Sequence, residues 1–219
     1  MQMFSKKNYF LFILIAFALN AQAQSIKDDD YMEVVKGRAF KIAAPLGIKD
    51  SAKFYRVRDK IAQEYAGIKT IDDEKEAAVK AVKAQNLDKA AADAELAKIT
   101  SLSEEKRIAL NKGFVQSLAE ELSAGQVEEV KNGLTYNVLP LTYKAHLDMI
   151  PTLKEEEKKY IYDALYEARE HAMAAGSSDA KHAWFGKYKG RINNYLASRG
   201  YDLTKEREAW YERIKAAKK

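Results

Sequence analysis

The sequence predicts an all-α protein, a helical bundle of roughly five to seven helices arranged as stacked antiparallel hairpins. Only three prolines interrupt the 219 residues, and alanine, glutamate, lysine and leucine, which favour helix, are abundant. Apolar residues recur at spacings of three and four over most of the chain. No segment alternates apolar and polar side chains as a half-buried strand does.

The first 23 residues have the organisation of a secretory signal peptide. Lys6 and Lys7 form a basic start, residues 9–19 are apolar, and Ala21-Gln22-Ala23 is a small-residue cleavage site. Cleavage after Ala23 predicts a periplasmic or secreted protein with no membrane span. The alternative, a short membrane anchor, needs about 20 apolar residues. The chain has no cysteine, which excludes disulfides and a lipid-acceptor thiol.

The mature chain, residues 24–219, is long enough for one all-α domain with a real core. Its charge is nearly balanced, because removal of the leader leaves 35 basic and 32 acidic residues. This balance and the export signal argue against a nucleic-acid partner. No cofactor motif occurs.

The first two helices are bounded by clear start and stop signals. One begins after the acidic residues 28–30 and ends at Pro45-Leu46-Gly47. The next begins at Asp50 or Ser51. Its buried stripe repeats every three or four residues and comprises Phe54, Val57, Ile61, Tyr65 and Ile68.

Residues 70–100 are rich in alanine and lysine and carry only a thin apolar stripe. Two interpretations remain open, a helical hairpin arm that projects into solvent and a mobile linker. Residues 101–104 then match a capping box and predict a helix start, and residues 123–126 and 152–155 repeat that pattern.

The C-terminal half contains the best core candidates. Residues 134–150 are the most apolar part of the mature chain, and a short extended piece is expected before Pro140. Residues 152–175 form a long helix, residues 179–198 form another that ends at Gly200, and a last helix starts at Thr204. The inward positions are Ile161, Leu165, Ala168, Ala172, Trp210 and Ile214.

Residues 176–195 are the most informative segment for function. On a helix, His182 shares one face with Gly186 and Gly190, while Phe185 and Ile192 mark the core side. A third face is cationic and aromatic and comprises Trp184, Tyr188, Arg191 and Tyr195, of which Tyr195 is expected to be core.

The two interior glycines lower helix propensity by roughly 2 kcal/mol together, relative to alanine. Close packing of a neighbouring helix on the glycine face is the favoured explanation. A ligand beside His182 is the alternative.

Cations interleaved with aromatic rings predict a binding surface for a sugar with carboxylate or sulfate groups. The blander alternatives are core aromatics and a solvated charged face. Arg58 is expected to pair with Asp59, but it is retained as a candidate across the groove. The predicted ligand-binding residues are Lys181, His182, Trp184, Lys187, Tyr188, Lys189, Arg191, Asn194, Arg58 and Tyr136.

Enzymatic chemistry is less clearly indicated. The three histidines are not at metal-ligand spacing, so no metal site is predicted. A lyase acting on acidic glycans would need Arg191 or Lys189 to neutralise the uronate carboxylate, and His182 or Tyr188 as the base. A third possibility is a helical periplasmic chaperone with a large exposed apolar concave face.

Three segments, residues 37–59, 127–138 and 167–202, resemble a family of exported Bacteroidetes proteins, the domain-of-unknown-function 3826 family. The resemblance is densest over residues 167–202 and thinnest over 70–100. It implies a sugar-binding protein encoded in polysaccharide-utilisation gene clusters, often those for acidic glycans. It supplies no catalytic residues.

Overall fold

A computed structural model of the chain describes residues 30–217. Every regular element in this range is a helix, so the all-α prediction is confirmed. The helical segment 30–43 and the seven α-helices that follow it make eight helices in the described residues, one more than the upper limit of seven that the sequence predicts. The elements are η1 (Ala44–Leu46), α2 (Ser51–Lys83), α3 (Lys89–Ala119), α4 (Ala124–Leu134), α5 (Val138–Met149), α6 (Glu155–Met173), α7 (Ser178–Ser198) and α8 (Leu203–Ala216).

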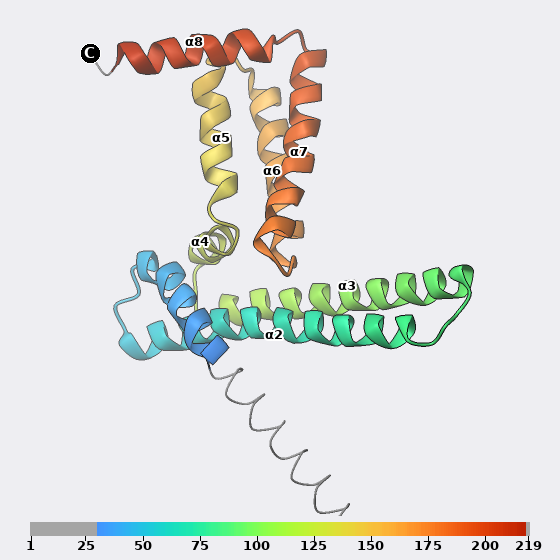
Figure 1. Cartoon of the computed structure of the whole chain (residues 1–219). Coiled ribbons are helices and arrows are strands. Elements are labelled where there is room, and N and C mark those ends of the chain that lie inside the picture. Colours follow the sequence, from blue (N-terminus) through green and yellow to red (C-terminus); the bar gives the residue numbers. More distant parts are fainter. Residues whose placement is uncertain (1–29, 218–219) are drawn as a thin grey trace, which may run out of the picture.

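The helices form a long hairpin and an upright bundle that stands across it (Figure 1). Helices α2 and α3 pack along each other as the antiparallel hairpin, and α5, α6 and α7 form the bundle. Helix α4 lies where the two parts meet, and α8 crosses the far end of the bundle. Residues 70–100 include the turn of the hairpin, which extends beyond the bundle.

Each part has its own apolar core. In the hairpin, Val57 and Ile61 of α2 pack with Leu118 of α3 and with Val35 of the N-terminal helical segment. In the bundle, the four predicted inward positions of α6 are all fully buried, and Phe185 and Ile192 of α7 pack against them. The predicted core sides of α6 and α7 are therefore confirmed.

Two predicted helix starts are confirmed by their capping bonds. The Asp50 carboxylate accepts a hydrogen bond from the backbone N–H of Lys53, 3.0 Å away, at the start of α2. Ser123 and Gln126 form the predicted reciprocal capping box at the start of α4. These short polar side chains satisfy backbone donors that a helix leaves free in its first turn.

Two other predicted starts are wrong. Helix α3 runs unbroken through residues 101–104, where the Ser103 hydroxyl donates within the helix to the backbone oxygen of Ile99. Helix α6 begins at Glu155, because the Glu157 carboxylate accepts from the backbone N–H of Lys154 at 2.8 Å. The Ser-x-x-Glu and Thr-x-x-Glu patterns at residues 101–104 and 152–155 therefore do not form capping boxes.

The extended piece expected before Pro140 is also wrong. Tyr136 and Asn137 adopt left-handed backbone conformations, and α5 begins immediately afterwards. Pro140 occupies the first turn of α5, where its missing N–H leaves no helical hydrogen bond unmade.

The predicted signal peptide, residues 1–23, lies outside the described residues. Among residues 30–217, no helix combines the length and apolar character that crossing a membrane requires.

Candidate functional site

Helix α7 distributes the predicted binding residues over three sides. Lys181 and Tyr188 are on the buried side, His182 and Lys189 are on one flank, and Trp184, Lys187 and Arg191 are on the opposite flank. His182 and Arg191 therefore do not converge as a lyase pair, since nine positions, or two and a half turns, separate them. Arg191 does lie close to the other candidate base, Tyr188.

The interior glycines of α7 face open space. Apart from the two chain neighbours and the backbone of α7 itself, no atom lies within 4 Å of where a Cβ would stand at Gly186 or Gly190. The favoured interpretation of close helix packing is therefore wrong. The exposed glycine face is left available for contact with another molecule.

A groove lies where the hairpin meets the bundle, with a volume of about 780 Å³. We call it the junction groove. It is formed by the N-terminal helical segment, α2, the α4–α5 turn and the start of α7. Four cations, one carboxylate and three tyrosines are among its lining residues: Arg38, Lys41, Lys69, Lys181, Asp72, Tyr31, Tyr65 and Tyr136.

Lys181 is part of the wall of this groove rather than a surface cation. Its side chain is only 5 % exposed, and its ammonium group donates to the backbone oxygen of Leu134 at 3.0 Å. Burial lowers the pKa of Lys181 to about 8, although the negative charge of Glu64 opposes this shift.

Glu64 of α2 is a buried carboxylate with unsatisfied hydrogen-bonding capacity. It is 3 % exposed, and neither carboxylate oxygen has a hydrogen-bond partner among residues 30–217. Burial raises the pKa of Glu64 to about 7, and Lys181 opposes this shift. The two groups thus form a weakly compensated charge pair at the junction.

Tyr65 and Tyr31 are held in the neutral form by their burial in the groove wall. Burial raises the pKa of Tyr65 to about 12 and also raises that of Tyr31, while the charge of Arg38 acts against both shifts. Tyr136, set by its left-handed turn, stacks on His182 with ring centroids 5.2 Å apart. This contact brings together two of the predicted binding residues.

Gly176 allows the start of α7 to approach the hairpin closely. A Cβ at this position would overlap the carboxylate of Asp72, which in turn pairs with Arg107 at 2.7 Å. Gly176 and Asp72 also line an adjoining cavity of about 390 Å³, and Tyr136 lines another of about 700 Å³. The junction groove therefore continues at both ends.

The opposite flank of α7 carries the predicted cation-aromatic contacts. Trp184 stacks on His171 with ring centroids 4.3 Å apart, and the Lys187 ammonium lies 4.9 Å from the Trp184 ring centroid. Arg191 covers Tyr188 in the same way at 4.5 Å. Trp184 and His171 line the 390 Å³ cavity, so this flank borders the groove system at one end.

The remaining predicted residues lie elsewhere. Arg58 pairs with Asp59 at 2.6 Å, which confirms the ion-pair interpretation, and it is not part of the groove lining. Lys189 and Asn194 are exposed. Among residues 30–217, no group of three or more histidine and carboxylate side chains could hold a metal ion.

Comparison with known protein families identifies the family of this chain. A family model described as a protein of unknown function, DUF3826, matches residues 32–216. The chain belongs to this family. The DUF3826 match includes every lining residue of the junction groove named above except Tyr31. No curated protein matches the chain.

Sequence reasoning missed most of the groove in this DUF3826 protein. Arg38 and Tyr31 come from the first helical segment, and Tyr65 and Lys69 come from α2. A usable signal was present, because residues 31 and 38 are seven apart and residues 65 and 69 are four apart, so each pair shares a helix face. Only packing reveals that these two faces meet.

Proposed function

We propose that this protein binds an oligosaccharide with uronate groups in the junction groove. The observation that carries this proposal is the convergence of four cations and three tyrosines, with a single carboxylate, on one groove of about 780 Å³. Arg38 and Lys41 have no hydrogen-bond or ion-pair partner among the described residues, so their charges are available to a ligand.

The chemistry of the groove suits an acidic sugar. A guanidinium group binds a carboxylate through two parallel hydrogen bonds, and a lysine ammonium supplies a compact point charge. Tyrosine rings offer apolar faces for the C–H faces of a sugar ring, and the hydroxyls of Tyr65 and Tyr136 can donate to its oxygens, whereas that of Tyr31 donates to the backbone oxygen of Tyr65. Because the groove continues into cavities at both ends, a chain of several sugars is the expected ligand rather than a single one.

The leader of residues 1–23 supports an exported setting, periplasmic or secreted. An exported protein meets polysaccharide fragments from outside the cell. Uptake and use of an acidic polysaccharide is therefore the process in which we place this binding activity.

Calorimetric titration of the mature protein with oligogalacturonides and with a neutral oligosaccharide of equal length tests the proposal. The acidic ligand is expected to bind more tightly, with an affinity that falls as salt rises. The double variant Arg38→Ala, Lys41→Ala should weaken binding at least tenfold. The double variant Lys49→Ala, Lys53→Ala removes the same charge outside the groove and should leave binding within twofold of wild type.

Equal affinity for acidic and neutral ligands, or unchanged binding in the groove variant, would refute the assignment. Trp184→Ala adds a second readout, because Trp184 lines the adjoining cavity. This variant should weaken long oligomers more than short ones. Unsaturated product absorbance during these titrations would instead favour a lyase.

A further inference from the structure

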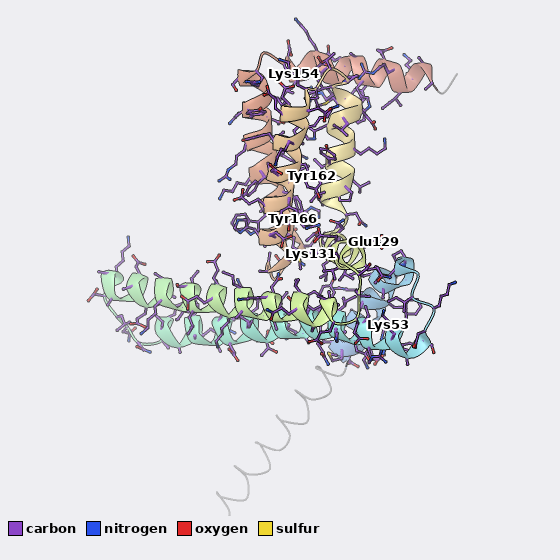
Figure 2. The ribbon with its side chains drawn as sticks, turned by 180° about the vertical axis from the view of Figure 1, so that it is seen from behind. Lys53, Glu129, Lys131, Lys154, Tyr162 and Tyr166 are labelled. Carbon is purple, nitrogen blue, oxygen red and sulfur yellow. The ribbon has the colours of Figure 1, made fainter. Side chains whose placement is uncertain are left out.

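The α5–α6 side of the bundle carries a row of tyrosines that the junction groove does not use. Tyr143 of α5 meets Tyr162 of α6 edge to face with ring centroids 5.4 Å apart, and Tyr162 lies 6.4 Å from Tyr166. We call these three residues the tyrosine ladder. Figure 2 shows Tyr162 above Tyr166 along the bundle, with Lys131 below them.

The ladder is open to solvent in a way that core tyrosines are not. Tyr162 is 41 % exposed and Tyr166 is 38 % exposed. None of the three hydroxyls has a hydrogen-bond partner among the described residues, whereas a tyrosine that serves only the core usually finds one. The hydroxyls, and the parts of the rings that Arg169 and the neighbouring tyrosines leave uncovered, are thus available to a ligand.

The foot of the ladder is polar but electrically balanced. The Arg169 guanidinium lies 4.7 Å from the Tyr166 ring centroid, and the Lys131 ammonium lies 5.9 Å from it. Both cations pair with Glu128 and Glu170. These two cations are therefore already neutralised, in contrast to Arg38 and Lys41 of the junction groove.

A cavity of about 330 Å³ lies beside the foot of the ladder, and both Lys131 and Glu170 line it. Asn111, Lys112 and Gln116 of α3 also line this cavity, and the structure gives their side chains no partner among residues 30–217. The two amide side chains each combine a donor and an acceptor, which is what a sugar hydroxyl requires.

We propose that the tyrosine ladder and its foot cavity form a second carbohydrate site, which binds a neutral oligosaccharide chain. The proposal rests on the proposed function only for the class of ligand. Consecutive sugar rings would pack their apolar faces on the tyrosines, and the amide groups of α3 would bind hydroxyls at one end. Because the ligand is uncharged, binding at the ladder is insensitive to salt, unlike binding in the groove.

Titration of the mature protein with cellohexaose, xylohexaose and mannohexaose, followed by calorimetry and by two-dimensional NMR, tests the ladder. At least one of these is expected to bind at high and low salt alike. Tyr162→Ala, Tyr166→Ala should weaken that binding tenfold or more. Tyr160→Ala is the matched control, because Tyr160 is on the same helix and 37 % exposed but stacks on Tyr195.

Asn111→Ala, Gln116→Ala is the second variant. It touches only surface amides and should weaken the same ligand without altering thermal unfolding. If wild type binds none of the neutral sugars, or if both double variants bind as well as wild type, the proposal of a second carbohydrate site is wrong. Binding of a proline-rich decapeptide in place of every hexasaccharide would overturn it too. Oligogalacturonide affinity measured in parallel reports on the groove separately.

Discussion

Replacing Glu64 by glutamine should stabilise the protein, and increasingly so as pH rises. The carboxylate is buried without a hydrogen-bond partner among the described residues, and burial raises its pKa to about 7. Glutamine has nearly the same shape as protonated glutamate but cannot ionise. The substitution therefore removes the cost of a buried negative charge while leaving the local packing intact.

The magnitude follows from proton linkage. The pKa of Glu64 is higher in the folded chain, about 7, than its ordinary value of 4.5. Stability from the protonated group is therefore complete below pH 4.5 and is lost as pH rises toward 7. The loss is about 1.4 kcal/mol per pH unit inside this window. Glu64→Gln should gain less than about 1 kcal/mol at pH 5 and about 3 kcal/mol at pH 8.

Urea unfolding of wild type and Glu64→Gln at pH 5, 6, 7 and 8 measures this difference directly. Comparison between the two proteins matters, because burial lowers the pKa of His146 and makes stability rise with pH in part of the same window. Glu95→Gln, on the exposed hairpin arm, is the control and should give a difference near zero throughout. A constant difference, or a less stable variant at pH 8, would contradict the reasoning and indicate that Lys181 compensates the charge of Glu64.

Replacing glycine by alanine should lower the stability at residue 176 and raise it at residues 186 and 190, and urea or thermal unfolding measures both effects. Gly176→Ala should lower the free energy of unfolding by about 1–3 kcal/mol, because its Cβ would overlap the Asp72 carboxylate. Gly186→Ala and Gly190→Ala should each raise it by up to about 1 kcal/mol, since both positions are helical and open. Arg169→Ala should lower it by about 3 kcal/mol, because that guanidinium is 1 % exposed and joins α6 to α4. If any of these variants is as stable as wild type, the structural reason given for that variant is wrong.

Local sequence rules predicted the elements whose signals agree with their packing. The apolar stripe of α6 and the caps at Asp50 and Ser123 are encoded within a few residues, so they could be read without the structure. The rules failed at residues 101–104, because a serine in a long helix can bond within the helix instead of starting one. They failed before Pro140, because proline is also well accommodated in a first turn.

The candidate site was predictable only in fragments. Tyr136 and His182 were both identified from sequence, and they do meet in the structure. Lys181 was also identified, but its burial could not be read from a run of charges. It depends on Leu134 and Glu64, which belong to other helices. Arg38 was missed because its role arises from packing between segments that lie far apart in the sequence.

The features that lower the stability of the fold lie around the junction groove. Glu64 and Lys181 are buried ions whose pKa values both move toward neutrality, and apolar side chains of similar volume would be at least as stable. A side chain at residue 176, just before α7, would displace the Asp72 carboxylate. Departures from the rules of stable packing concentrate where a protein binds or reacts. On the flank of α7 that carries Trp184, Lys187 and Arg191 both lie over rings of the same helix. In the groove, Arg38 and Lys41 have neither a ring nor an ion-pair partner among the described residues, so the groove is the stronger candidate for the functional centre.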